Sequence, residues 1–144
     1  GTTILYSREF YRQAKQILTP NGMFVQWVFF FSFPDDIKMI MQSFLQEFPF
    51  VQAFRSPIGI GFYFIGSQQE LKFDQNSFAQ KLQATPSAWA DLNEWGKMDA
   101  KYLMSLYLGD KATLQKLVGN SEAITDDRPR TEYFLLRHFL SPGQ

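Results

Sequence analysis

The architecture of this chain depends on residues 20–31, which read Pro20-Asn21-Gly22-Met23-Phe24-Val25-Gln26-Trp27-Val28-Phe29-Phe30-Phe31. The Pro-Asn-Gly triplet is turn chemistry that ends the segment before it. Residues 23–31 then form a nearly continuous apolar run of β-branched and aromatic types. Such a run is typical of a strand that is covered on both faces, as in a parallel sheet. We therefore predict a buried strand over 23–31.

Helical patterns flank this strand on both sides. Residues 7–18 place apolar side chains at helical spacing, and Ser7 is a good N-cap. A second helix begins at Pro34, where proline suits the first turn and the carboxylates of Asp35 and Asp36 favour the positive end. Pro49 ends it.

Two further strands are predicted over 50–55 and 60–66. Ser56-Pro57-Ile58-Gly59 joins them and is rich in turn residues. Because this connection is short, the two strands should be antiparallel neighbours. The order up to residue 67 is therefore helix, strand, helix, strand, strand, which is an α/β pattern.

The rest of the chain is predicted to be a small helical subdomain. Four short segments each begin with Asp or Ser, which are favourable N-cap residues: Asp74–Ala84, Ser87–Trp95, Asp99–Leu108 and Asp110–Val118. We accordingly divide the chain into residues 1–67 and a helical extension over 68–144, which ends in a charged tail.

Composition excludes several functions. The formal net charge is +0 and there is no basic stripe, so we expect no nucleic-acid partner. The chain has no Cys and one His, which excludes thiolate chemistry and His-rich zinc sites, and we predict no metal site. The sequence contains no secretory signal and no apolar stretch of roughly 20 residues, so a cytoplasmic location is expected.

Motifs at both ends of the chain resemble those of spermidine synthase-like proteins. Near the start, Leu5-Tyr6 and Phe10-Tyr11 lie in a helix that leads through Gly22 into a strand carrying Gln26. Residues 54–62 resemble the Tyr-Pro-x-Gly-x-x-Gly-Phe segment of that family. The tail Thr125-Asp126-Asp127-Arg128-Pro129 with Glu132-Tyr133-Phe134 resembles that of longer bacterial members, some of which are fused to membrane helices.

The resemblance implies the C-terminal half of a Rossmann-like methyltransferase fold. In that fold the last two strands are antiparallel, and the final one inserts beside the fifth. Family members bind S-adenosylmethionine or its decarboxylated form through a Gly-rich loop after the first strand and an acidic residue after the second, and their catalytic aspartate follows the fourth strand. All three would lie upstream of Gly1. The family's substrate-side tyrosine also has no counterpart here, since Arg55 or Ser56 occupies that region.

Gln26 and Trp27 are the candidate substrate-binding residues. A side-chain amide at the C-terminal end of such a strand points toward the crevice where α/β proteins bind ligands. In the resemblance, Gln26 matches a glutamine that contacts the polyamine, and its carbonyl can accept from an ammonium group. The alternative is a glutamine that ties down a loop. Trp27 either lines the same crevice, where an indole face attracts cations, or packs in the core.

The charged tail is interpreted as a structural latch. Asp126, Asp127, Arg128 and Glu132 bring both signs of charge into seven residues, and the proline after Arg128 favours an extended backbone. A guanidinium that pairs with a carboxylate would hold this tail against the body. The other possibility is that the acidic pair faces a cationic substrate.

Two functions are consistent with these patterns. The first is the C-terminal part of an aminopropyl- or methyltransferase of polyamine chemistry, with a polyamine-like substrate in the parent protein and no cofactor site or activity in these residues alone. The second is a non-catalytic interaction domain. The strand at 23–31 would then have an unpaired edge, which is a template for another chain, and we expect a homo-oligomer. Membrane attachment would come only through segments outside these residues.

Overall fold

A computed structural model describes residues 2–29, 34–72, 74–94, 96 and 99–128. The elements in this part of the chain are, in order, η1 (Thr2–Tyr6), α1 (Arg8–Ile17), β1 (Met23–Val28), α2 (Pro34–Glu47), β2 (Phe50–Arg55), β3 (Phe62–Ser67), α3 (Gln75–Gln83), α4 (Pro86–Glu94), α5 (Ala100–Ser105), β4 (Tyr107–Asp110) and α6 (Lys111–Val118). The strands form one sheet in the order β1-β3-β2-β4, in which neighbours are antiparallel.

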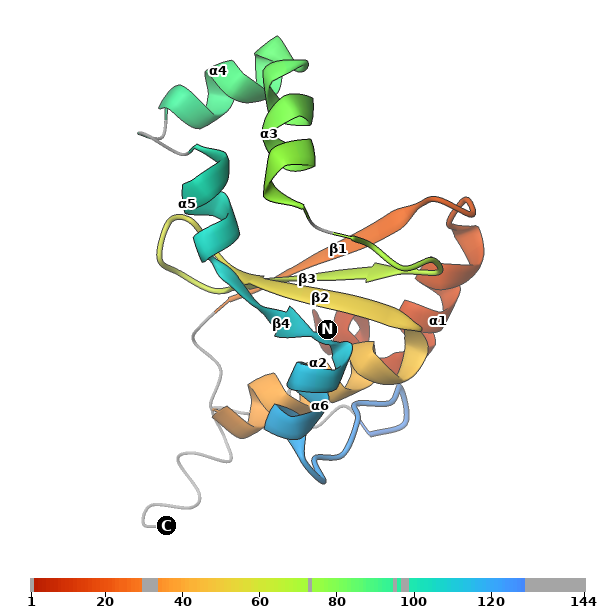
Figure 1. Ribbon diagram of the computed structural model, residues 1–144. Coiled ribbons are helices and arrows are strands. Elements are labelled where there is room, and N and C mark those ends of the chain that lie inside the picture. Colours follow the sequence, from red (N-terminus) through yellow and green to blue (C-terminus); the bar gives the residue numbers. More distant parts are fainter. Residues whose placement is uncertain (1, 30–33, 73, 95, 97–98, 129–144) are drawn as a thin grey trace.

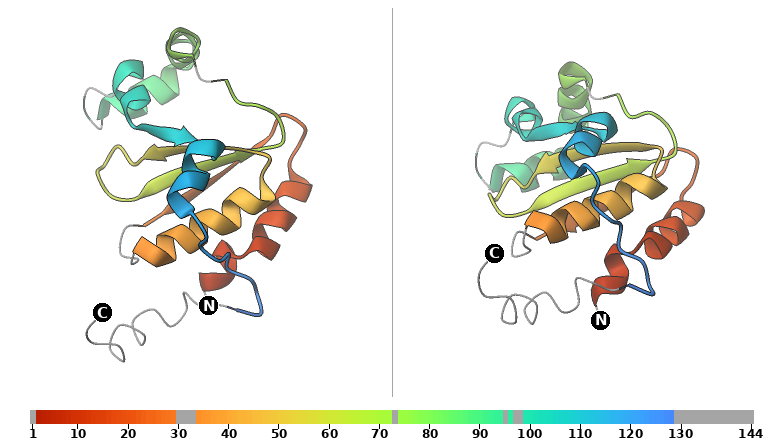
Figure 2. Two further views of the ribbon diagram at one scale, coloured as in Figure 1. Left: turned by 60° about the horizontal axis from the view of Figure 1, so that its bottom comes forward. Right: turned by 90° about the horizontal axis from the view of Figure 1, so that it is seen from below.

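Helices lie on both sides of this sheet. α1, α2 and α6 pack on one face and enclose the core, whereas α3, α4 and α5 lie on the opposite side (Figures 1 and 2). The chain crosses between the two sides at β4, since α5 precedes this strand and α6 follows it. The second half of the chain therefore contributes both a strand to the sheet and a helix to the core layer.

The α/β class is confirmed, and the bounds of α1, α2, β2 and β3 agree with the prediction to within about two residues, whereas β1 ends at Val28. Ser7 caps α1 by accepting from the N–H of Phe10, and β2 and β3 are antiparallel neighbours as predicted. β3 also pairs with β1, so it lies between β1 and β2. The described sheet is antiparallel, however, and its order is not that of a classic Rossmann sheet.

The prediction that the strand at 23–31 is covered on both faces is wrong. In β1 the side chains of Met23, Val25 and Trp27 are exposed, while Phe24 is half-buried and Val28 is buried. Side chains alternate between the two faces of a strand, and only one face of β1 packs on the helix layer. An antiparallel strand with one covered face shows this alternation, whatever the hydrophobicity of the residues on its other face.

The helix predicted over Asp99–Leu108 is also wrong at its C-terminal end. α5 stops at Ser105, and the following residues form β4, which pairs with β2. Tyr107 donates its hydroxyl to Gln52 Oε1 at 2.6 Å, and its ring lies 5.2 Å from that of Phe54. These cross-strand contacts involve residues more than 50 positions away, so they override the local helical pattern.

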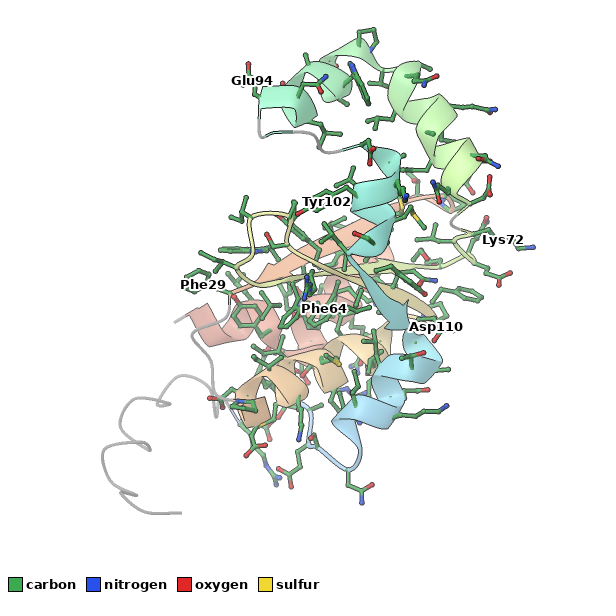
Figure 3. All side chains as sticks on the ribbon, turned by 60° about the vertical axis from the view of Figure 1, so that its left-hand side comes forward. Phe29, Phe64, Lys72, Glu94, Tyr102 and Asp110 are labelled. Carbon is green, nitrogen blue, oxygen red and sulfur yellow. The ribbon has the colours of Figure 1, made fainter. Side chains whose placement is uncertain are left out.

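Aromatic rings fill the core between α1, α2 and the sheet. Tyr11, Phe44, Phe48 and Phe64 are essentially inaccessible to solvent, and Figure 3 shows Phe64 on the side of the sheet that faces α2. Tyr11 and Phe44 meet edge to face, with ring centroids 4.9 Å apart, an arrangement that aromatic quadrupoles favour. Burial raises the pKa of the Tyr11 hydroxyl far above its ordinary value, so this group stays neutral.

A cluster of charges joins α1 to the C-terminal end of α2. The Glu47 carboxylate, only 5% exposed, accepts from Arg8 and Arg12 at 3.0 Å each. Lys15 Nζ donates to the backbone carbonyl of Glu47 at 2.7 Å. Burial disfavours the charged form of Glu47, but the hydrogen bonds from Arg12 and Arg8 outweigh this and hold its pKa below the ordinary value.

We expect Glu47→Gln to lower the melting temperature at neutral pH and to remove part of its acid dependence. The folded pKa of Glu47 lies below the free value of 4.5. Its ion pairs therefore stabilise the fold fully above that pH and lose effect as the pH falls through the folded pKa. Thermal melts at neutral pH and in steps from about pH 5 to about pH 2 measure the difference between the two proteins.

Glu94→Gln is the matched control, because Glu94 is an exposed carboxylate on α4. It should leave the melting temperature unchanged at every pH. An acid dependence in Glu47→Gln as steep as that of the wild type would contradict the role of this carboxylate.

Candidate functional site

The candidate site lies at the C-terminal end of β1, where the hairpin between β2 and β3 folds against it. The Trp27 indole Nε1 donates to the carbonyl of Ile60 in this hairpin at 3.4 Å. The Trp27 ring also lies 5.3 Å from that of Phe29, which follows β1. The hairpin and the end of β1 therefore form one surface.

Two glycines allow this close approach. Gly59 and Gly61 have φ values of 80° and 85°, which L side chains rarely adopt. At Gly61 a Cβ atom would lie 2.4 Å from the carbonyl oxygen of Val28 and 2.8 Å from Trp27 Nε1, whereas at Gly59 it would meet nothing within 4 Å. Gly61 is therefore required for contact with β1, while Gly59 serves the turn alone.

A cavity of about 360 Å³ opens in the hairpin, lined by Arg55, Ser56, Gly59, Gly61 and Phe62. Arg55 is exposed, and Ser56 is only 3% exposed. Within the described residues the Ser56 hydroxyl has no hydrogen-bond partner. Buried polar groups are normally paired, so this hydroxyl is an exception in need of a reason.

The two predicted substrate-binding residues lie on opposite faces of β1. Gln26 shares the face of Phe24 and Val28, is half-buried, and donates its amide to the carbonyl of Trp27 at 3.0 Å. Trp27 is on the other face and 40% exposed, so core packing does not account for it. The substrate-binding roles of Gln26 and Trp27 stay predictions. The sequence analysis did not select Arg55 and Ser56 as residues of a common cavity. The order of the residues alone does not reveal that the Ser56 hydroxyl is buried without a hydrogen-bond partner among the described residues.

A second, apolar cavity of about 310 Å³ lies between the sheet and helices α3 and α5. Val25, Tyr63 and Ile65 contribute from the sheet, and Phe78 and Leu103 contribute from α3 and α5. Tyr102, labelled in Figure 3, donates from α5 to the carbonyl of Pro57 at 3.3 Å. Arg55 and Pro57 also line this cavity, so it adjoins the same hairpin.

The tail is attached to the body through a residue that the sequence analysis did not select. Ile124 is fully buried; its N–H donates to Ser43 Oγ at 2.7 Å, and its carbonyl accepts from the N–H of Arg8 at 2.9 Å. Two features of the sequence could have indicated this anchor. Ile124 is an isolated isoleucine in a polar stretch, and Ser43 is a serine within the apolar stripe of α2.

The predicted latch residues follow this anchor. The N–H of Asp126 donates to Glu9 Oε2 at 3.1 Å, and the Thr125 hydroxyl, 2.5 Å from Asp127, lowers the pKa of that carboxyl. The backbone of Arg128 closes a turn onto Thr125, and its side chain is exposed. Glu132 lies outside the described residues. A latch role for these side chains stays a prediction.

Neither a metal centre nor a membrane segment is found in the described part of the chain. It contains no group of three or more His, Asp or Glu side chains placed to hold a metal ion. Its helices are also too short or too polar to cross a bilayer.

The fold is spermidine synthase-like. The chain is similar to the crystal structure of a probable spermidine synthase from Corynebacterium glutamicum ATCC 13032, with a TM-score of 0.56 and 16% sequence identity. The similarity covers 85% of this chain and 41% of that one, so these residues span about two fifths of that protein. No protein-family model matches the sequence, and no curated protein is significantly similar to it.

We expect Gly61→Ala to destabilise the chain by about 1–3 kcal/mol more than Gly59→Ala. Both substitutions place alanine at a positive φ, but only the Cβ at residue 61 collides with β1. Gly59→Ala is thus a matched control for backbone strain. Urea unfolding measures the free energies, and equal losses in the two variants would show that the hairpin does not press on β1.

Proposed function

We propose that these residues form the substrate-side part of a spermidine synthase-like transferase, and correspond to the C-terminal half of its Rossmann-like methyltransferase fold. The observation that carries this proposal is the structural similarity over 85% of the chain. The insertion of β3 beside β1 supports it further, because the family resemblance of the sequence implies that pairing.

The cofactor would be bound outside these residues in this proposal. Gly59 and Gly61 join two strands, so no helix N-terminus follows them to receive a phosphate or carboxylate of a nucleotide cofactor. Neither glycine therefore forms a nucleotide-binding turn of the strand-to-helix kind. The longer protein would supply that cofactor, whose sulfonium activates the carbon to be transferred.

The contribution of this chain would be to bind and orient the acceptor amine. Gln26 would supply an amide carbonyl from one face of β1 and Trp27 an aromatic ring from the other, and each of these groups interacts favourably with an ammonium group. The residues lining the hairpin cavity include no Asp, Glu or His that could act as a base. Their role is therefore positioning, which alone can account for a large part of a rate enhancement.

Calorimetric titration of these residues and of a longer protein that contains them tests the proposal. The 144 residues alone should bind neither S-adenosylmethionine nor its decarboxylated form, whereas the longer protein should transfer an aminopropyl or methyl group. In the longer protein, Gln26→Ala should raise the KM for the amine about tenfold, since a hydrogen bond to a charged group is lost.

Gln16→Ala is the matched control, because Gln16 is exposed near the end of α1, and it should leave the KM unchanged. Tight cofactor binding by the 144 residues alone would contradict the proposed division of labour. A longer protein that transfers neither group would contradict the activity.

A second candidate function is assembly through the edge of β1. Among the described strands β1 pairs only with β3, so its other edge has no strand partner there. Met23, Val25 and Trp27 are exposed on this same strand. An open edge with apolar side chains favours pairing with a second copy of the chain.

Light scattering over a range of concentrations should accordingly detect a dimer or larger species. Val25→Lys should shift the chain toward monomer, because a charge on an edge strand opposes strand pairing. Ile17→Lys is the matched control, since Ile17 is 86% exposed but lies on α1. A wild-type chain that is monomeric throughout would exclude this candidate.

A further inference from the structure

We propose that the hairpin cavity binds an oxyanion, a carboxylate or a phosphate group of a small ligand, with Arg55 as the pairing cation. This proposal deepens the proposed function, because it places a negative group on the substrate of the same site. Only the statement that the ligand is a substrate rests on the proposed function. The anion site itself is inferred from the residues of the cavity.

Arg55 is the one charged residue on β1, β2, β3 and the hairpin between the last two. It is the sole charged residue between Glu47 and Glu70, and the sequence has none between Lys15 and Asp35. β1, β2 and β3 lie within these two stretches, so three adjoining strands and their hairpin carry one charge. Nothing on these strands neutralises the guanidinium.

The side chain of Arg55 is available to a ligand. Arg55 is exposed, and within the described residues no ion pair includes it. Its backbone N–H is already bonded to the carbonyl of Leu106 at 2.8 Å, which fixes the position of its main chain. The exposed guanidinium offers a planar fork of donors that matches a carboxylate or a phosphate.

Ser56 provides a second donor in the same cavity. Its hydroxyl is buried and has no partner among the described residues, so it can donate to an oxyanion that enters. Gly59 and Gly61 have no side chains to fill the space, and Phe62 supplies an apolar wall. The cavity lining thus holds one cation and one unpaired donor, and it includes no carboxylate.

The same features disfavour a purely cationic ligand. An ammonium group in the cavity would meet an uncompensated guanidinium, and like charges repel at this range because water and salt screen them incompletely. A diamine such as putrescine should therefore bind this cavity more weakly than a small anion. The ligand that fits carries an acidic group at the Arg55 end.

Backbone NMR titrations test the proposal, with inorganic phosphate and acetate as separate probes at constant ionic strength. Both probes, or one of them, should shift the amide resonances of Gly59 and Gly61 saturably. Arg55→Gln should weaken this binding at least tenfold, while Arg55→Lys should retain part of it. Lys116→Gln, which removes an exposed cation on α6, should leave the affinity unchanged.

The two probes identify the chemistry: a response to acetate alone assigns a carboxylate, and a response to phosphate alone assigns a phosphate. No saturable shift with either anion overturns the proposal, as does binding that Arg55→Gln leaves intact in a variant whose spectrum is otherwise native. Putrescine that shifts the glycine amides while the anions do not also overturns it, and leaves the transferase proposal standing. Anion binding without group transfer in the longer protein supports the site and rejects the transferase.

Discussion

The junction between α2 and β2 is the constraint on which the rest of the structure depends. The ring of Phe48 lies directly against Gly66 of β3, where an added Cβ would approach the ring to 2.4 Å. The preceding residue, Glu47, binds the cations of α1, and the carbonyl of Phe48 accepts from Lys111 of α6 at 2.6 Å. Two consecutive residues therefore hold α1, α6 and β3 in place.

The position of the hairpin at the candidate site depends on this junction between α2 and β2. β2 begins two residues after Phe48, and its register with β3 determines where the turn at Ser56 and Gly59 lies relative to β1. Gly61 then allows the turn to reach Trp27 and the end of β1. The same register places Arg55 at the end of β2, opposite Phe62 of β3, where it lines the hairpin cavity.

The residues that determine the fold differ from the residues that would determine the function. Similarity to a probable spermidine synthase reaches across most of the chain at 16% identity, and it concerns the packing of helices on a sheet. The chemistry that we propose for the site would depend on side chains that such a similarity does not fix, including Gln26, Arg55 and Ser56. A fold of this kind can keep its architecture while its ligand changes, because the site is made by side chains and not by the fold itself.

Local signals in the sequence determined the helices and the hairpin: Ser7, Asp74, Asp99 and Asp110 each cap a helix through their own side chain, and turn residues separate β2 from β3. Tertiary structure alone decided that β1 has an open face, that Tyr107–Asp110 is a strand, and that Ile124 anchors the tail. The reason is physical. A cap or a turn acts within four residues, whereas these three features arise from partners far away in the sequence, which local pattern cannot specify.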